Sequence, residues 1–367
     1  MVHDNPRQPI HIPPERIALL QKNLLRWFHC RARDLPWRRT RDPYAIWVSE
    51  IMLQQTQVDT VIDYYRRFLA RFPDVEHLAR ARLDTVLKLW EGLGYYGRAR
   101  NLHKAARQIV GLSGQLPRDA SQWRQLPGIG EYTANAIASI AWDQSVPVVD
   151  GNVIRVMSRL FCIAGDPKTP QTYRTVRTYA QMLVPEKGCG DYNQALMELG
   201  ALVCRPKGPD CRHCPVKALC EAFDTDRTDV FPETVKRTPI PLQEIAVGIV
   251  FKSGRILIDR RPPKGLLGGL WEFPGGKINH GESPEQAAIR EVWEELRIRI
   301  TVQEPLVTVH HAYTHFKVRI HAFLCRHLEG RPLCRSSTAV RWIWPSQLDR
   351  YAFPAANKRI IQTLRHR

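Results

Sequence analysis

Four cysteines within 17 residues restrict this chain more than any other feature of its sequence. They stand in "CRPKGPDCRHCPVKALC" as Cys204, Cys211, Cys214 and Cys220, a C-x6-C-x2-C-x5-C spacing. Four thiolates this close in the chain can wrap one small inorganic centre. Zinc commonly uses two C-x2-C pairs, and only one pair is that close here. The spacing therefore favours a [4Fe–4S] cluster, with zinc or a chance group of buried thiols as the alternatives.

The charge of the chain indicates an anionic partner. Its 367 residues include 54 Lys and Arg but only 36 Asp and Glu, a formal net charge of +18. Residues 241–367 carry 20 basic and 11 acidic side chains, so both parts of the chain are cationic. Such a balance indicates a polyanion such as nucleic acid or a membrane surface. No apolar run approaches the roughly 20 residues that span a bilayer, so we expect a cytoplasmic, nucleoid-associated monomer.

The pattern of apolar residues divides the chain into two domains. From Glu15 to about Ala218 they recur every three or four residues, as amphipathic helices require. A polar, Pro-containing stretch over 222–242 reads as a linker. Beyond it, "EIAVGIVFKSGRILIDRR" predicts two short strands around a Ser-Gly turn, and "FKVRIHAFLCRHL" alternates like a strand. We predict an all-α domain over 1–221, with its cysteine loop at 204–220, and a mixed α and β domain over 243–367.

A glycine-containing turn predicts a phosphate contact. In "LPGIGEYTANAIASIAW", Gly128 and Gly130 come directly before a helical pattern. Glycine permits backbone conformations closed to other residues, and amides at a helix N-terminus point toward a nearby anion. Such a turn can hold a DNA phosphate without reading sequence. Gly-x-Gly by itself is equally typical of an ordinary turn between helices.

Two carboxyl groups indicate acid chemistry. Glu50 lies in the otherwise apolar helical pattern "YAIWVSEIMLQQTQV", and Asp150 lies between an apolar run and a Gly-Asn turn in "VPVVDGNVIRV". Burial raises the pKa of a glutamate so that it can carry a proton, whereas an aspartate in a polar turn stays ionised. Cleavage of a glycosidic bond needs such an acid and such an anion. A turn-forming Asp150 and a Glu50 that caps a helix or pairs with a cation remain the alternative.

The order of these motifs resembles that of the helix-hairpin-helix DNA glycosylases related to endonuclease III, over residues 20–221. Within that superfamily the chain looks like a MutY-type adenine DNA glycosylase. The blocks that carry this resemblance are "LPWR", "SEIMLQQTQV", "GLGYYGRARNLHKAA", "LPGIGEYTANAI", "VDGNVIRV" and "NQALMELGALVC". The resemblance implies a base excision repair enzyme that flips adenine, mispaired with 8-oxoguanine or G, out of double-stranded DNA and hydrolyses its glycosidic bond.

The resemblance also implies roles for particular residues. Glu50 would protonate adenine and later help activate water, and Asp150 would stabilise the sugar cation. The remaining positions form three sets: Tyr132 and Asn152 support the catalytic pair; Arg33, Trp37, Leu53 and Gln194 line the adenine pocket; Gln55, Leu93 and Tyr95 wedge into the base stack, while Gly128 and Gly130 contact DNA. Trp37 and Tyr95 could instead be core aromatics.

Tyr132 bears on strand cleavage. Endonuclease III-like enzymes carry a lysine at this position, which forms a Schiff base and cuts the DNA strand. With tyrosine there, the resemblance implies a monofunctional glycosylase that leaves an abasic site. Any lyase activity would have to come from another amine, such as Lys104, and should be weak.

The C-terminal part contains a second motif. "GGKINHGESPEQAAIREVWEELRIRI" fits the Nudix box except that Arg297 replaces its final glycine. Glu291, Glu294 and Glu295 share one helical face and could hold Mg²⁺. The resemblance to MutT, a Nudix hydrolase of 8-oxoguanine nucleotides, covers about residues 243–345 and implies an α-β-α Nudix fold.

MutY-type proteins use a MutT-like domain to read 8-oxoguanine in DNA. Tyr313, Thr314 and His315 in "HHAYTHFKVRIH" resemble the loop that contacts the lesion, although an ordinary loop at a strand end is the alternative. Two other interpretations of the whole chain stay open. The first is a bifunctional fusion that also hydrolyses 8-oxo-dGTP through the Nudix box. The second is a noncatalytic DNA-binding protein.

Overall fold

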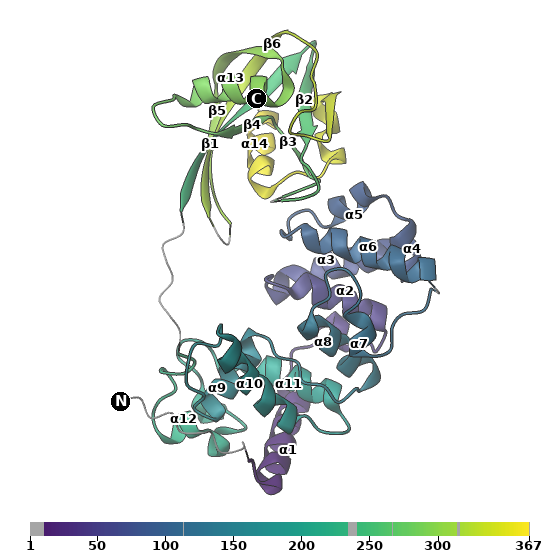
Figure 1. Ribbon diagram of the computed structural model, residues 1–367, viewed down its shortest axis with the longest axis vertical. Helices are drawn as coiled ribbons and strands as arrows, with labels where there is room; N and C mark the ends of the chain where they lie inside the picture. Colours follow the sequence, from purple (N-terminus) through teal and green to yellow (C-terminus); the bar gives the residue numbers. More distant parts are fainter. Residues whose placement is uncertain (1–10, 113, 234–240, 266, 314–315, 367) are drawn as a thin grey trace. The chain divides into compact units, whose positions relative to one another are not determined.

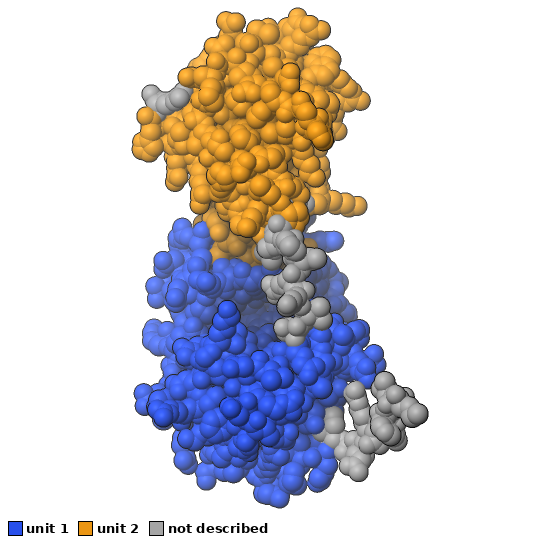
Figure 2. All heavy atoms as spheres, turned by 90° about the vertical axis from the view of Figure 1, so that its left-hand side faces the viewer, with its two compact units in different colours: residues 1–77, 104–237 blue, residues 78–103, 238–367 orange. Residues whose placement is uncertain are grey.

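The computed structural model describes residues 11–112, 114–233, 241–265, 267–313 and 316–366. Contacts within the chain define two compact units, coloured separately in Figure 2. Unit 1 comprises residues 1–77 and 104–237, and unit 2 comprises residues 78–103 and 238–367. Of the proposed linker, 222–242, residues 234–240 lie outside the described residues, while its first residues belong to α12 (Glu221–Asp224) and its last, Leu242, begins β1 (Leu242–Lys252). Unit 2 is therefore larger than the predicted C-terminal domain, since it includes a segment from the predicted helical domain.

Unit 1 is helical (Figure 1). It contains α1 (Pro14–Arg31), η1 (Pro36–Arg38), α2 (Pro43–Leu53), α3 (Val58–Arg71), α7 (Ala120–Trp123), α8 (Glu131–Trp142), α9 (Gly151–Leu160), α10 (Pro170–Leu183), α11 (Cys189–Leu202), the 3₁₀ turns η2 (Cys211–His213) and η3 (Lys217–Leu219), and α12 (Glu221–Asp224). Two further helices, α4 (Val75–Arg80) and α6 (Gly97–Leu112), run across the division between the units. None of the described helices is long and apolar enough to cross a membrane.

Side-chain caps fix where several of these helices begin. The carboxylate of Asp42 accepts from the amide of Tyr44, with Pro43 at the first helical position of α2. The carboxylate of Asp150 accepts from the amide of Val153 at the start of α9. Helix α8 begins after Gly130, and Gly128 has a φ of +77°, which favours glycine. The glycine turn and α8 therefore occur where the sequence predicts them, whereas the Gly-Asn turn predicted after Asp150 is instead the first turn of α9, with Asp150 as its cap.

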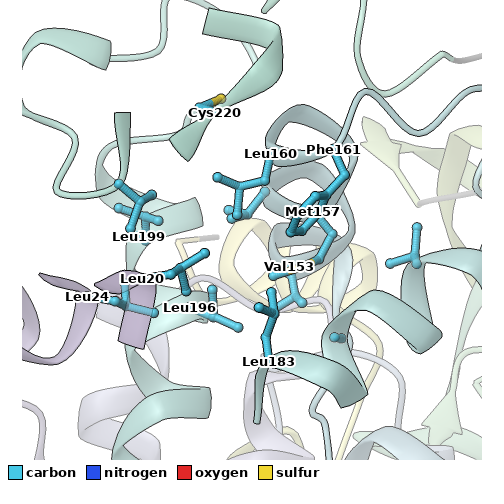
Figure 3. Packing of buried hydrophobic residues seen from close by; sticks show 14 of the residues in the cluster. Leu20, Leu24, Val153, Met157, Leu160, Phe161, Leu183, Leu196, Leu199 and Cys220 are labelled. Atoms are coloured by element: carbon cyan, nitrogen blue, oxygen red, sulfur yellow. The ribbon is translucent and has the colours of Figure 1, made fainter. Parts of the chain in front are cut away.

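The core beneath the cysteine loop joins helices from both ends of unit 1. Leu20 and Leu24 of α1, Val153 and Met157 of α9, and Leu196 of α11 belong to one cluster of buried side chains (Figure 3). Cys204, Cys214 and Cys220 also pack against this cluster or belong to it. The cysteine loop is thus anchored to the same core that holds α9, whose first residues follow Asp150.

Unit 2 is built around a mixed sheet. In the described residues the sheet has seven strands, β1 (Leu242–Lys252), β2 (Arg255–Arg260), β3 (Trp271–Glu272), β4 (Gly275–Lys277), β5 (Arg299–Ala312), β6 (Lys317–Glu329) and β7 (Ala339–Ile343). Its main path runs β3-β2-β1-β6-β5; β4 pairs with β1, and β7 pairs with β2. Only β1 and β6 are parallel among these pairs. The predicted hairpin between β1 and β2 is confirmed: Ser253 and Gly254 both have positive φ, as a type I′ turn requires.

One helix covers each face of this sheet. Helix α13 (Pro284–Leu296) packs Ala287, Ala288, Val292 and Leu296 against one face. Helix α14 (Ala355–Arg365), which follows the 3₁₀ turn η4 (Pro345–Arg350), packs Ala356 and Ile360 against the other face. Both helices are labelled in Figure 1. The α-β-α arrangement predicted for the C-terminal part is confirmed.

Residues 78–103 join unit 2 through hydrogen bonds to the segment before α14. Helix α5 (Leu83–Leu89) presents Lys88, whose ammonium donates to the carbonyl of Tyr351 at 3.0 Å. The amide of Phe353 donates to Oε1 of the buried Glu91 at 2.9 Å. These partners lie more than 250 positions apart in sequence, so no local pattern predicts their association.

The residue that replaces the last glycine of the Nudix box occupies a conformation suited to glycine. Arg297 follows α13 with φ of 54° and ψ of 36°, and its amide donates to the carbonyl of Trp293. A side chain at such a position costs on the order of 1 kcal/mol. Its guanidinium lies 5.2 Å from the ring centroid of Trp293, a cation–π contact that offsets part of this cost.

Candidate active site

A cavity of about 200 Å³ lies among the helices of unit 1. Its wall brings together the predicted catalytic and adenine-pocket residues from segments far apart in the chain. The lining residues are Arg33, Leu35, Trp37, Arg38, Glu50, Leu53, Thr56, Val58, Tyr132, Asp150, Asn152, Gln194, Met197, Glu198 and Ala201. The cavity is therefore the candidate active site.

Glu50 is the buried acid of this cavity. It lies in α2 among apolar neighbours and is only 4% exposed. Its Oε2 accepts a hydrogen bond from the hydroxyl of Tyr132 at 2.8 Å. Burial, together with the charge of Asp150, raises the pKa of Glu50 to about 7, although the Tyr132 hydrogen bond and the charge of Arg38 act to lower it. Glu50 can thus hold a proton near neutral pH.

Asp150 is held in a more polar setting. Its Oδ1 accepts from the amide of Val153 at 2.7 Å, and its Oδ2 accepts from Nδ2 of Asn152 at 2.8 Å. Burial raises the pKa of Asp150, while these two donors and the charge of Arg155 oppose the shift. Since the pKa of Glu50 rises to about 7, the cavity contains a proton donor together with a second carboxyl group, Asp150, whose hydrogen-bond donors favour the anion against the effect of burial.

Sequence reasoning missed Glu198, a third carboxyl group in the wall. It projects from α11 with its side chain 1% exposed, and two arginines bind it. Arg33 donates from Nε and Nη2 at 2.8 and 2.7 Å, and Arg38 donates from Nη2 at 2.8 Å. Burial raises the pKa of Glu198, but these donors outweigh it and lower the pKa to about 2. The signal was present in "NQALMELGALVC", where one acid interrupts an apolar helix, as with Glu50.

Glu198→Gln should therefore destabilise the chain. Removing the carboxylate leaves Arg33 and Arg38 without their shared anion. We expect the free energy of unfolding to fall by about 2–3 kcal/mol. This is less than the loss for a fully buried ion pair, because both arginines reach solvent. The pKa of Glu198 is lower in the folded chain than in the unfolded chain. Its ion pairs with the arginines therefore stabilise the fold fully at pH values above the unfolded pKa, and this contribution is lost as the pH falls toward 2. Chemical denaturation at pH 7 measures the loss. Asp34→Asn, which removes the exposed partner of Arg39, is the matched control and should leave the midpoint unchanged.

A chain of hydrogen bonds connects Asp150 with the cysteine loop. Asn152, which donates to Asp150, accepts at Oδ1 from Nη2 of Arg155 at 2.9 Å. Arg155 also donates from Nε to the carbonyl of Cys204 at 2.7 Å. The orientation of the Asp150 carboxylate therefore depends on the backbone at the start of the cysteine loop.

The four cysteines of the loop lie close enough that a charge on one changes the pKa of another. Burial raises the pKa of the Cys214 thiol to about 12, and charge on Cys204, Cys220 and Cys211 acts in the same direction. The buried Arg159 donates from Nη1 to the sulfur of Cys204 at 3.3 Å. Among the residues described, no three His, Cys, Asp or Glu side chains meet where one metal ion could bind. Four cysteine thiols on one loop are nevertheless the donor set that zinc sites and iron–sulfur clusters both use.

The predicted DNA-contacting residues fall in both units. In unit 1, Gln55 has a φ of +55°, and Gly128 and Gly130 form the turn before α8. In unit 2, Tyr95 has a φ of +47° and is 40% exposed, whereas Leu93 is buried. Non-glycine residues in this region of φ are strained, and such strain is frequent at ligand-binding positions.

Tyr313 lies beside the Leu93 and Tyr95 segment within unit 2. A cavity of about 370 Å³ has Leu93, Tyr95, Tyr313 and Phe316 in its wall. The Tyr313 ring stacks on Phe316 at 4.8 Å between centroids. Thr314 and His315, the other predicted lesion-reading residues, lie outside the described residues.

Two carboxylates of the Nudix helix share an arginine, and the third has a different partner. Arg290 donates to Glu291 and Glu294 at 2.9 and 3.3 Å, and it also binds Glu282. Glu295 instead accepts from the amide of Gly275 at 3.1 Å, and burial raises its pKa to about 7. In the described part of the chain, these acids do not form a group able to hold a metal ion.

Comparison with known proteins agrees with this architecture. Residues 48–182 match the HhH-GPD superfamily of base excision DNA repair proteins, and residues 246–363 match the NUDIX domain family. A rat (Rattus norvegicus) protein described as adenine DNA glycosylase is 37% identical over 416 aligned residues, which cover 97% of this chain and 80% of the rat protein.

Two solved structures resemble the chain over a little more than half its length. A thermostable thymine-DNA glycosylase is 29% identical with a TM-score of 0.53, covering 57% of this chain and 98% of its own. An endonuclease III from a non-covalent DNA complex is 21% identical, with a TM-score of 0.50. The similarity covers 59% of this chain and 99% of the endonuclease III chain, and it shows that the two share a fold.

The fold and the cavity thus define a DNA N-glycosylase of the helix-hairpin-helix class, carrying a NUDIX domain at its C-terminal end. The chain belongs to the adenine DNA glycosylase family. The family resemblance and the fold class predicted from the sequence are confirmed.

Proposed function

We propose that this chain removes adenine mispaired with 8-oxoguanine or G from duplex DNA, hydrolyses its N-glycosidic bond and leaves an abasic site. The observation that carries the proposal is the pair of carboxyl groups in one cavity. Glu50 has a pKa raised to about 7, and Asp150 accepts two hydrogen bonds that favour its anion. This is the division of roles that glycosidic cleavage requires.

In the proposed reaction the adenine leaves the base stack first. A base inside a duplex cannot reach two buried carboxyl groups, so the nucleotide must be flipped into the cavity. The indole of Trp37, the side chain of Leu53 and the amide of Gln194 line this cavity. Apolar walls with one amide suit a planar base that offers hydrogen-bonding groups at its edge.

Glu50 then acts as the general acid. Its proton passes to a ring nitrogen of adenine, so the base departs neutral as the bond to C1′ breaks. Asp150 stabilises the positive charge that develops on the sugar. Water adds at C1′ and gives its proton to the Glu50 carboxylate, which restores the acid for the next turnover.

We expect the enzyme to leave the DNA strand uncut. A Schiff base with the sugar requires an amine beside C1′. No lysine lines the described cavity, and Tyr132 uses its hydroxyl to bind Glu50. Lys104 lies in α6 and does not line the cavity either.

The rate should depend on pH through both carboxyl groups. Excision needs Glu50 protonated and Asp150 ionised, so the rate should fall above about pH 7 and fall again in acid. The Tyr132 hydrogen bond lowers the pKa of Glu50, so Tyr132→Phe should move the alkaline limb to higher pH. Single-turnover rates across pH measure this shift, with Tyr173→Phe, outside the cavity, as the control. A limb that moved to lower pH would contradict the assignment of Glu50 as the acid.

We propose that the cysteine loop binds a [4Fe–4S] cluster through Cys204, Cys211, Cys214 and Cys220. The bound cluster would cross-link this loop, whose backbone is connected to Asp150 by hydrogen bonds through Arg155 and Asn152. Iron and sulfide analysis should give four of each per chain. Cys211→Ser should lower both, together with the visible absorbance of the cluster. Cys30→Ser, an exposed cysteine in α1, should change neither. One bound zinc per chain would contradict the proposal.

Recognition of 8-oxoguanine is assigned to Tyr313, Thr314 and His315 of unit 2. The support is that Tyr313 shares a cavity with Leu93 and Tyr95, the segment proposed to wedge into the stack. Nucleotide hydrolysis by α13 is the second candidate function. It is disfavoured because Arg290 already binds Glu291 and Glu294.

The test compares duplexes that carry A opposite 8-oxoguanine, G, C or T, beside an 8-oxo-dGTP assay with Mg²⁺. Loss of adenine opposite 8-oxoguanine and G without nucleotide turnover supports the proposal. Turnover that requires Mg²⁺ and is lost in Glu294→Gln would establish a bifunctional enzyme, and no adenine loss from any duplex would leave only DNA binding.

A further inference from the structure

Unit 2 contains a second cavity whose wall is strongly cationic. It measures about 330 Å³. One side is formed by residues from 82–88, at and within α5, and the other by residues from β3, β7 and the segment that ends η4. None of these residues belongs to the adenine cavity or to the cavity at Tyr313.

The charges in this wall do not cancel. Four cations line it, namely Arg82, Lys88, Arg341 and Arg350, against a single carboxylate, Asp84. Asp84 is already bound by Arg260 at 2.7 Å, and Lys88 is bound to Glu91 at 2.8 Å. Within the described residues, Arg82, Arg341 and Arg350 have no carboxylate within ion-pair distance. The wall of the cavity therefore carries more positive than negative charge, and its one carboxylate, Asp84, is already paired with Arg260.

One of these arginines is held in place by aromatic rings. The guanidinium of Arg341 lies 5.3 Å from the ring centroid of Trp271 and 5.8 Å from that of Tyr351. It also donates from Nη1 to the hydroxyl of Tyr351 at 3.3 Å. An arginine fixed by such interactions gives up little side-chain entropy when it binds an anion.

We propose that this cavity binds the phosphate group of a nucleotide, in the first instance a backbone phosphate of duplex DNA. Guanidinium groups match the oxygens of a phosphate in pairs. Cationic side chains supply most of the sequence-independent affinity of proteins for DNA. The site goes beyond the proposed adenine chemistry, since it would hold DNA whatever base is removed.

The test compares two full-length triple variants with the same change in net charge. R82Q/R341Q/R350Q alters the cavity. R326Q/R331Q/R335Q removes three arginines of unit 2 that do not line it. Affinity for one undamaged duplex is measured between 50 and 200 mM KCl, and thermal unfolding checks the fold.

The cavity variant should bind DNA more weakly, and the slope of log K against log salt should become shallower by about 0.9 for each phosphate that the variant no longer binds. The control variant should keep the parental slope. If the triple variant fails to fold, R350Q alone should reduce the slope by about 0.9.

A second arm titrates dGMP and inorganic phosphate by calorimetry. Binding that is present in the parent and absent from the cavity variant, with an unchanged DNA slope, would identify a free nucleotide or phosphate as the source of the ligand. The proposal would be overturned if both variants kept the parental slope of log K for DNA binding against log salt and the parent bound neither dGMP nor phosphate. Because the readout is affinity for undamaged DNA, its failure is separate from a failure of adenine excision.

Discussion

Glu50→Gln should reduce adenine release by about 10³-fold or more while leaving affinity for the mismatched duplex almost unchanged. Glutamine has nearly the same shape, and it can keep the hydrogen bond with Tyr132. It cannot give a proton to the departing base, and general acids contribute about 10²–10⁴ to such rates. The leaving group would have to depart as an anion, and the water would lack its base.

Single-turnover excision with enzyme in excess measures this effect, because product release does not then limit the rate. Glu76→Gln makes the same chemical change in α4, away from the cavity, and should retain the parental rate. If Glu50→Gln excised adenine at the parental rate, Glu50 could not be the acid.

Asp150→Asn should cost about 10³-fold in excision with little loss of stability. Asparagine is as good a helix N-cap as aspartate, so the hydrogen bond to Val153 and the start of α9 should survive. What disappears is the negative charge proposed to face the sugar, together with the acceptor for Nδ2 of Asn152; removing one such electrostatic interaction costs about 10²–10³. The effect should appear in the chemical step and not in DNA binding.

Asp119→Asn is the matched control, because Asp119 also caps a helix of unit 1, with its side chain accepting from the amide of Gln122. The same replacement there should leave excision unchanged. Equal reductions of activity in Asp119→Asn and Asp150→Asn would mean that Asp150 acts only as a cap.

Much of the candidate site could be predicted from local sequence because its signals are local. Glu50 interrupts an apolar helical pattern, and Asp150 ends an apolar run directly before Gly151 and Asn152, which begin α9. The structure brings both to one cavity with Tyr132 and Asn152. Glu198 has the same local signal as Glu50, yet its role depends on Arg33 and Arg38, more than 150 positions away.

Other features have no local signal at all. Residues 78–103 belong to unit 2 because Lys88 and Glu91 bond to the backbone near Tyr351 and Phe353. The cationic cavity likewise depends on the approach of α5 to β3 and β7. In the Nudix box, the alignment of Glu291, Glu294 and Glu295 on one helical face predicts a shared cation, but it does not show that Arg290 binds the first two or that Glu295 accepts from the amide of Gly275.

The central claim is hydrolysis of adenine from its mispair with 8-oxoguanine without cutting of the DNA strand. The most direct measurement is a single-turnover reaction on a duplex labelled on the adenine strand, analysed with and without alkali. The account predicts free adenine and a labelled strand that stays intact until alkali breaks it at the abasic site. An intact strand after alkali, or strand cleavage without alkali, would contradict it.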